Sequence, residues 1–241
     1  MPVYGKDFAA IYNLKWNDFT QRTWPFVIQM VRLHSPHAET WLDLCCGTGA
    51  LLKRASAAGY TVTGVDSSIF QLQFAQKNVP GAGLVCQDVR SMALRRPFDI
   101  ITCMYDSLNY LLEKNELKRA FSRIRQTVHE QSLFIFDMNT YEGLHDHWNQ
   151  TFSIKLTHGV VLVDSSFEAE SALGTCRITG VMHKGRQLRR FREEHLERGY
   201  YAEQIQTELK KSGFTFIAYD GDRLTQPGMR PSRLLYICRP V

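Results

Sequence analysis

The sequence predicts an α/β fold in which a mostly parallel, seven-stranded sheet carries helices on both faces. Strand-like runs and helical patterns alternate five times between residues 40 and 139, which indicates successive βα units. After residue 140 this alternation gives way to short β-like segments separated by turn signals, which is typical of antiparallel hairpins. With 241 residues, 44% of them hydrophobic, the chain is long enough to bury a sizeable core.

The first elements in chain order are helices, followed by the alternating series. Residues 4–33 read as helices, because Phe8, Ile11 and Tyr12 share one helical face that Trp16 extends. We expect strands at Trp41–Cys45, Thr61–Val65, Gly83–Gln87, Phe98–Tyr105 and Ser132–Asn139. We expect helices at Gly49–Ala58, from Ser67 or Ser68 to the segment "VPGAG", and at Asn115–Val128.

The second half of the chain predicts an insert and the closing elements of the sheet. Residues 152–198 predict antiparallel hairpins that turn at "THG", "SALG" and "HKGRQ". A helix follows over "YAEQIQTELKKSG" with the glycine at its C-terminal cap, and strands at 214–219 and 233–238 form a hairpin that completes the sheet. The expected division of the chain is residues 1–150 and 199–241 for the core, residues 1–33 within it for a helical lid, and residues 151–198 for an insert that covers the substrate site.

Composition and charge disfavour several classes of protein. No apolar run approaches the ~20 residues that span a bilayer, and the N-terminal segment lacks the order of a secretory signal, so we expect a cytoplasmic protein. The six cysteines form no C-x-x-C pair, which predicts free thiols rather than disulfides or a metal site. The net charge of +5 is mild, and two glutamates follow its densest basic cluster, "HKGRQLRRFR", so a nucleic-acid partner is disfavoured.

The segment "DLCCGTG" has the outline of a nucleotide-binding turn but lacks the glycines of a dinucleotide site. Gly47 and Gly49 satisfy the start of G-x-G-x-x-G, whereas Leu52 occupies the position of the third glycine, which allows close packing around a pyrophosphate. Asp43 precedes the turn, where a carboxylate would repel a pyrophosphate but suits an ammonium or sulfonium group. The loop therefore predicts a ligand with a positive pole.

Two further acids end the next two strands. Asp66 is placed to accept hydrogen bonds from both hydroxyls of a ribose. Asp88, with Val89 beside it, is placed to meet an adenine edge. A ligand with a ribose, an adenine, a positive pole and no demand for phosphate contacts matches S-adenosylmethionine.

These segments together resemble a known family. "DLCCGTG", "VDSS", "CQDVR" and "FDIITCMYDSLNYL", spaced over residues 40–139, resemble the class I S-adenosylmethionine-dependent methyltransferases, whose sheet is Rossmann-like. The resemblance implies that the glycine loop contacts the methionine part of the cofactor and that residues 103–105 form a wall. The cofactor-binding residues we expect are Asp43, Cys45, Gly47, Gly49, Asp66, Ser67, Asp88, Val89, Cys103, Tyr105, Tyr12 and Trp16.

The flanking segments narrow the likeness to small-molecule methyltransferases. "FAAIYN", "SLNYL" and "RRFREEH" resemble members with an antiparallel cover, such as amino-sugar N,N-dimethyltransferases and glycine N-methyltransferases. The chain departs from many nucleic-acid enzymes, because "YDSLNY" replaces the D/N-P-P-Y loop and no Pro-Cys nucleophile motif occurs. The resemblance implies a small-molecule acceptor methylated at nitrogen or oxygen, and it leaves a homodimer open.

Methyl transfer from a sulfonium is an in-line displacement, so alignment and exclusion of water should contribute more than a strong base. We expect Tyr105 and Asn109, which follow the fourth strand, in the acceptor site, with a turn cap as the alternative role of Asn109. His195 is our candidate proton acceptor or orienting residue. Asp137 and Asn139 end the fifth strand at the same edge, and the "HDH" segment reads as a surface turn.

Three other functions stay open at this point. An RNA (tRNA) methyltransferase would use the basic cluster to contact phosphates. A nicotinamide-dependent oxidoreductase is the second, and Leu52 argues against it. A non-enzymatic cofactor-binding scaffold is the third. We expect S-adenosylmethionine as cofactor, a small-molecule methyl acceptor as partner, and no membrane partner.

Overall fold

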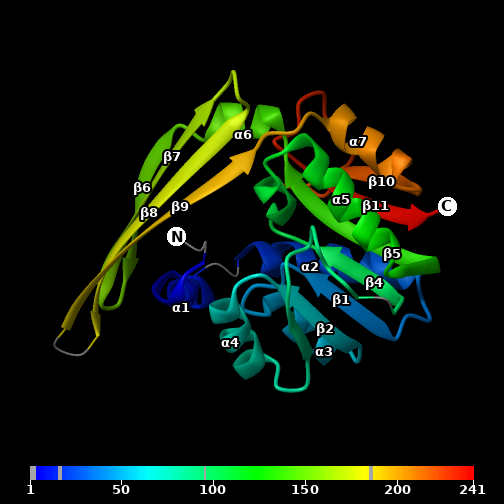
Figure 1. The fold of residues 1–241 in the computed structure, drawn as a ribbon, viewed down its shortest axis with the longest axis horizontal. Helices are drawn as coiled ribbons and strands as arrows, with labels where there is room; N and C mark the ends of the chain where they lie inside the picture. The colour runs from blue at the N-terminus through cyan, green and yellow to red at the C-terminus, as the bar shows by residue number, and fades with distance from the viewer. Residues whose placement is uncertain (1–3, 16–17, 95, 185–186) are drawn as a thin grey trace.

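The computed structural model describes residues 4–15, 18–94, 96–184 and 187–241, which form two β-sheets and their helices (Figure 1). The main sheet consists of β1 (Thr40–Leu44), β2 (Thr61–Asp66), β3 (Gly83–Cys86), β4 (Phe98–Cys103), β5 (Val128–Asn139), β10 (Phe214–Asp220) and β11 (Arg233–Pro240). The second sheet consists of β6 (Gln150–Leu156), β7 (Gly159–Glu168), β8 (Leu173–Lys184) and β9 (Gln187–Arg198). The helices are α1 (Lys6–Lys15), α2 (Asp18–His34), α3 (Ala50–Ala57), α4 (Ile69–Asn78), α5 (Lys114–Arg125), α6 (Tyr141–His147) and α7 (Ala202–Lys211), with a 3₁₀ helix, η1, at Ser107–Tyr110.

The main sheet confirms the predicted seven strands and their mostly parallel arrangement. Its strand order is β10-β11-β5-β4-β1-β2-β3. The pairs β2–β3, β1–β2, β1–β4 and β4–β5 are parallel, whereas β11 runs antiparallel to both of its neighbours. The strand order reverses between β1 and β4, so the carboxyl ends of these strands border the crevice in which α/β proteins bind ligands.

Strand β5 shows how the sequence builds two apolar layers. Its side chains alternate, so Phe134 and Phe136 pack on the face covered by α5 and α7, whereas Leu133 and Ile135 pack on the face covered by α2 and α3. All four side chains are fully buried. A strand covered on both faces therefore explains the continuous apolar run that predicted it.

Gly64 on β2 explains how Leu52 occupies the position of the third glycine. A Cβ at Gly64 would lie 2.6 Å from Cδ1 of Leu52 and 2.7 Å from Sγ of Cys46. Both distances are too short for real carbon contacts, so the space that Leu52 needs is provided on the strand rather than on the helix. The close packing of helix and strand is kept with the glycine moved to the opposite partner.

The second sheet is antiparallel throughout and extends away from the main sheet, with α1 lying between the two (Figure 1). Phe8 and Ile11 of α1 pack in one cluster with Val161, Val163 and Ile178 of the second sheet. The amphipathic face predicted for the first helix is thus buried against the insert. Trp16, expected on the same face, lies outside the described residues.

Two elements differ from the sequence-based expectation. Residues 141–147 form α6 rather than a surface turn, because the Thr140 side chain accepts a hydrogen bond from the Gly143 N–H at 3.0 Å and caps a helix. The helix expected at Asn115–Val128 ends at Arg125, and Val128 already belongs to β5. Within the described residues, no helix is long and apolar enough to cross a membrane.

Candidate functional site

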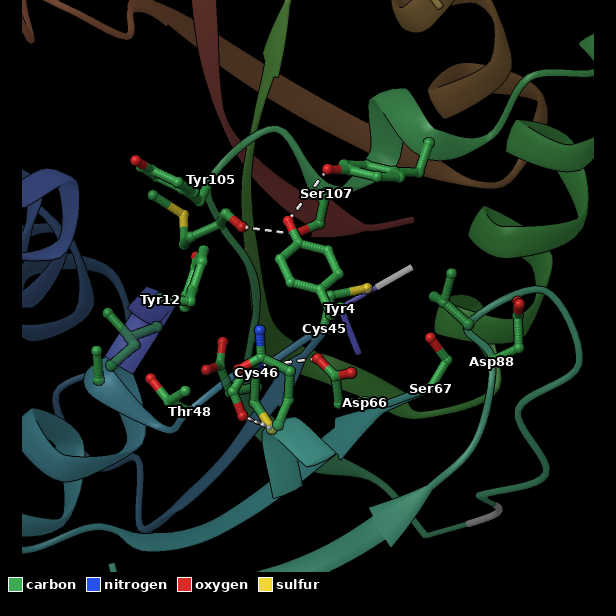
Figure 2. Close-up of a pocket in the computed structure, with 18 of the residues that line it drawn as sticks. Tyr4, Tyr12, Cys45, Cys46, Thr48, Asp66, Ser67, Asp88, Tyr105 and Ser107 are labelled. Carbon is green, nitrogen blue, oxygen red and sulfur yellow. Dashed lines mark hydrogen bonds between the residues drawn. The ribbon is translucent and has the colours of Figure 1, made fainter. Parts of the chain in front are cut away.

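A cavity of about 270 Å³ lies at the carboxyl ends of β1, β2 and β4, beneath α1 and α2. Figure 2 shows Asp66, Ser67 and Asp88 along one side of this cavity, with Tyr12 and Tyr105 on the other. The cavity therefore has a side formed by strand ends and a side formed by aromatic rings.

The loop between β1 and α3 needs three left-handed backbone positions. Cys45, Gly47 and Gly49 have φ angles of 53°, 53° and 81°. The Gly47 N–H donates to Asp66 Oδ2 at 2.8 Å, which ties the loop to the end of β2. A Cβ at Gly49 would lie 3.2 Å from the Cβ of Ala75 in α4. Gly49 thus permits packing of the loop against α4, whereas Gly47 lines the cavity.

Asp66 organises the start of α4 as well as the loop. Its Oδ1 accepts a hydrogen bond from the Ser68 N–H at 2.8 Å, and the Ser68 side chain accepts one from the Gln71 N–H as the cap of α4. Burial raises the pKa of Asp66, although the backbone donors at Ser68 and Gly47 oppose this shift. A second lone pair on each carboxylate oxygen is left for donors in the cavity.

Asp43 lies at the base of the cavity and is 3% exposed. Its Oδ1 accepts a hydrogen bond from Thr102 Oγ1 at 2.6 Å, and Thr102 in turn accepts one from Trp41 Nε1 at 2.9 Å. Burial raises the pKa of Asp43 to about 7, against the lowering effect of the Thr102 hydroxyl. A cation bound beside this carboxylate would offset the cost of its burial.

Gln71 provides an independent sign that a polar ligand belongs here. Its side chain is 1% exposed and lies in the cavity wall, and its Oε1 atom has no hydrogen-bond partner among the described residues. A buried acceptor without a partner is costly unless a ligand donor or water satisfies it. Together with Asp43 and Asp66, it fits a ligand that carries N–H or O–H donors and a positive charge.

Asp88 and Val89 form the far end of the same side. Val89 is buried, and Asp88 is held by Arg90 through two side-chain contacts of 2.9 and 2.6 Å and a backbone contact of 2.8 Å. Hydrogen bonding from the Arg90 side chain lowers the pKa of Asp88, which keeps it ionised. Arg90 also donates to Glu116 at 2.5 Å, so its charge is compensated by two acids.

Four phenols face one another on the other side of the cavity. The ring of Tyr4 lies 5.5 Å from that of Tyr12 and the ring of Tyr12 lies 6.4 Å from that of Tyr105, each pair edge to face. Tyr110 completes the group, with its Oη 3.1 Å from Tyr4 Oη. Burial raises the pKa of each of these four phenols, so all stay neutral at ordinary pH. We call this group the phenol chamber.

The segment that carries Tyr4 is fastened at both ends. Glu193 of β9 accepts hydrogen bonds from the Tyr4 N–H at 2.9 Å and from the Gly5 N–H at 2.7 Å. On the other side, Ser68 Oγ donates to the Tyr4 carbonyl at 2.8 Å. We call residues 4–5 the strap, because they join the second sheet to the loop after β2 across the cavity.

A buried ionic cluster holds the loop that carries Tyr105. Tyr105 and Asp106 have φ angles of 67° and 50°, and Asp137 accepts hydrogen bonds from their N–H groups at 2.5 and 3.1 Å. Arg233 pairs with Asp137 and, at 2.6 Å, with Asp106, to which Asn139 also donates at 2.9 Å. Asp137 and Asn139, which sequence placed at the ligand edge, thus support the loop and do not line the cavity.

The structure brings together nine of the predicted site residues. The cavity is lined by Tyr12, Asp43, Cys45, Gly47, Asp66, Ser67, Asp88, Val89 and Tyr105. Gly49 and Cys103 do not line it, because Gly49 faces α4 and Cys103 is fully buried in the core beneath the loop. Trp16 lies outside the described residues.

The two other catalytic candidates lie behind the cavity wall. The Asn109 amide donates to the carbonyls of Asn139 and Arg198, both at 2.8 Å, and accepts from the Asn139 N–H at 2.9 Å, so it joins three elements and faces no ligand. His195 is 3% exposed, and its Nδ1 lies 2.9 Å from Tyr110 Oη. Neither residue lines the cavity, and their expected catalytic roles stay predictions.

Sequence reasoning missed three residues that shape the site. Tyr4 and Tyr110 line the chamber, and Glu193 fixes the strap. Tyr110 belongs to the "SLNYL" segment that carried the resemblance to small-molecule methyltransferases, and a phenol next to the predicted site residue Asn109 was an available signal. Glu193 lies in the quoted segment "RRFREEH", but its partners are 188 and 189 residues away, so the sequence does not indicate its role in holding the strap.

The fold and this cavity define a Rossmann-like protein with a site for a ligand that carries donors and a positive group. A family model described as a methyltransferase domain matches residues 42–131. An S-adenosylmethionine-dependent methyltransferase from Clostridium acetobutylicum is 27% identical and superposes with a TM-score of 0.82, over 97% of this chain and 98% of that one. The chain belongs to the class I S-adenosylmethionine-dependent methyltransferases, as predicted, and S-adenosylmethionine is its cofactor.

Two further proteins are similar to this chain, one in fold and one in sequence. DesVI from Streptomyces venezuelae has the same fold, with a TM-score of 0.81 and 21% identity over 99% of this chain and 100% of that one. A dTDP-3-amino-3,6-dideoxy-alpha-D-glucopyranose N,N-dimethyltransferase from Streptomyces fradiae is 35% identical over 129 residues, which is 52% of this chain and 50% of the relative. The superposition with DesVI spans nearly the whole of this chain and therefore includes its antiparallel second sheet.

Proposed function

We propose that the protein transfers the methyl group of S-adenosylmethionine to a nitrogen or oxygen of a small molecule, with an amine nitrogen as the acceptor we favour. The observation that carries this proposal is the phenol chamber, whose four neutral rings line the cavity and whose Tyr4 is held by the strap contacts. Neutral phenols accept hydrogen bonds from an ammonium, and aromatic faces stabilise cations. A chamber of this chemistry suits an acceptor that is positively charged before or after the transfer.

The charges around the chamber support an amine over an anionic acceptor. Arg90, which lines the cavity, is paired with Asp88 and Glu116, and Arg233 behind the chamber is paired with Asp106 and Asp137. Neither arginine has charge left over to bind a phosphate or carboxylate. The name of the Streptomyces fradiae relative, an N,N-dimethyltransferase of an amino sugar, points to the same chemistry.

Each part of the site has a role in this reaction. S-adenosylmethionine, when bound, supplies an electrophilic methyl group on a sulfonium. Asp43 and Gln71 are placed to hold its positive and donor groups, and Asp66 to hold its ribose. Tyr12 and Tyr105 are placed to exclude water and align the acceptor, which is the main catalytic contribution that such a displacement needs.

An acceptor screen tests the proposal. Labelled S-adenosylmethionine is supplied with three sets of compounds: amines including amino sugars, hydroxylated compounds matched in shape, and bulk tRNA. We expect methylation in the amine set and none in the tRNA. Methylation confined to the hydroxylated set would move the acceptor to oxygen. Methylation of tRNA, with binding that weakens steeply as salt rises, would replace the proposal with an RNA substrate.

A further inference from the structure

A continuous hydrogen-bonded path leads from the phenol chamber to a buried histidine. Tyr4 Oη lies 3.1 Å from Tyr110 Oη, and Tyr110 Oη lies 2.9 Å from His195 Nδ1. The three residues come from three separate segments: the strap, η1 and β9. Both phenols line the cavity and His195 does not, so the imidazole communicates with the chamber through the tyrosines.

The surroundings of the imidazole fix which nitrogen is free to accept a proton. Nε2 of His195 lies 3.4 Å from Oε2 of Glu193, without hydrogen-bond geometry. A bare Nε2 facing this carboxylate would be repelled, so Nε2 carries the proton and Nδ1 accepts the hydrogen bond from Tyr110. The ring packs against Phe8 at 5.2 Å, Cys176 stands opposite in register on β8, and the acid next along this face of β9 is Glu197.

The two phenols are suited to pass a proton and unsuited to keep one. Burial raises the pKa of Tyr4 and of Tyr110, and the acid Glu197 raises both further, so neither forms a phenolate at ordinary pH. With Tyr110 donating to His195, Tyr4 donates to Tyr110. The free lone pair of Tyr4 Oη then faces the chamber, ready to accept a hydrogen bond.

We propose that His195 is the proton acceptor for the bound methyl acceptor, reached through Tyr110 and Tyr4. This inference rests on the proposed function, because it requires an acceptor that arrives as an ammonium. One N–H bond of the ammonium breaks and leaves its electron pair on nitrogen, while Tyr4 Oη gains that proton. Tyr4 passes its own proton to Tyr110, and Tyr110 passes its own to His195 Nδ1.

The proton transfer has a favourable result both at the nitrogen of the methyl acceptor and at His195. The nitrogen gains the lone pair that displaces the methyl group, and both tyrosines end as neutral phenols. His195 becomes an imidazolium whose Nε2–H faces the carboxyl group of Glu193. Glu193 is held in place by the two N–H groups of the strap, so the charge that stabilises the imidazolium is already positioned.

The test compares His195→Gln and Tyr110→Phe with the wild type, using the amine identified in the acceptor screen. We expect kcat/KM at neutral pH to fall roughly a hundredfold in each variant, which is typical for loss of a proton acceptor. Raising the pH supplies deprotonated amine from solution, so the deficit should shrink to about threefold near the pKa of the free amine. A deficit that stays constant with pH would overturn the proposal, because a merely structural role has no such rescue.

Two matched variants control for loss of packing. His129→Gln changes a histidine paired with Asp99 outside the site, and Tyr200→Phe removes a buried hydroxyl that donates to the Leu111 carbonyl. We expect neither to produce a deficit that depends on pH. If Tyr200→Phe reproduced the effect of Tyr110→Phe, the effect would belong to the loop and the relay would be refuted.

A second measurement needs no methyl acceptor and so separates this proposal from the proposed function. In protein with ¹⁵N-labelled histidine, the ring of His195 should show a protonated Nε2 and an unprotonated Nδ1, and Tyr110→Phe should shift the Nδ1 signal. A proton on Nδ1 in the resting protein would refute the relay. If no amine were methylated while the tautomer was as expected, the proposed function alone would fail.

Discussion

Replacing the carboxylate of Asp43 with an amide should stabilise the folded protein and weaken its binding of the cofactor. Asn keeps an oxygen that can accept the hydrogen bond from Thr102, and it removes a group whose charge is buried. The pKa of Asp43 rises from 3.8 to about 7 on folding, mainly because the side chain is buried. An acid with a raised folded pKa stabilises the fold fully at low pH, and this contribution is lost as the pH rises toward about 7.

The magnitude follows from the width of that pH interval. Between about pH 5 and about pH 8 the wild type loses up to about 1.4 kcal/mol of unfolding free energy per pH unit from this group, and less per unit as Asp43 ionises, or about 3 kcal/mol in all. The side chain is 3% exposed, so solvent screening reduces this little. Relative to the wild type, Asp43→Asn should therefore become more stable by about 3 kcal/mol over this interval.

Urea unfolding of both proteins at about pH 5 and about pH 8 measures this difference directly. Calorimetry with S-adenosylmethionine gives the second half of the test. Wild-type affinity should rise with pH up to about 7 as Asp43 ionises, and Asp43→Asn should bind about tenfold more weakly at about pH 8. The reasoning would be refuted if the unfolding free energy of Asp43→Asn fell relative to that of the wild type as the pH rose. It would also be refuted if the affinity of the wild type for the cofactor did not depend on pH.

Three other substitutions probe the packing around the site. Gly64→Ala should destabilise the protein by about 1–3 kcal/mol through its clash with Leu52, and urea unfolding should show that adding Leu52→Ala recovers part of this loss. Arg233→Leu leaves the buried Asp137 and the partly buried Asp106 without their cation, so the unfolding free energy should fall by about 3–5 kcal/mol, whereas an unchanged urea midpoint would show that the ionic cluster does not stabilise the fold. Glu193→Ala removes the acceptor for the strap, and hydrogen exchange of the Gly5 amide should speed up markedly while exchange in β5 stays the same.

The cofactor side of the site was predictable because its signals are local. Gly47 and Asp66 stand within one β-turn-α-β unit, and the structure joins them by a single hydrogen bond across 19 residues. The glycine motif alone does not say whether the missing Cβ makes room for a ligand or for a helix, and at Gly49 it makes room for α4. The order of strands and helices was predictable for a similar reason, because each βα unit is contiguous in the sequence.

The acceptor side was not predictable because its contacts are distant in sequence. Tyr110 and His195 are 85 residues apart, and Tyr4 and Tyr110 are 106 apart, so no local pattern joins them. His195 was singled out as a titratable residue within the segment "RRFREEHLERGY", which indicated its chemistry but not its position in the fold. Its position behind two tyrosines depends on how the second sheet packs against the strap, and that packing is a tertiary property.

Ser68 links the two halves of the site. Its N–H donates to the Asp66 carboxylate on the cofactor side, its Oγ accepts from the Gln71 N–H, and the same Oγ donates to the Tyr4 carbonyl of the strap. A ligand that shifts Asp66 or Gln71 therefore acts on the residue that fastens the strap. Because Tyr4 also begins the hydrogen-bonded path to His195, Ser68 connects the cofactor side of the cavity with the proposed proton relay.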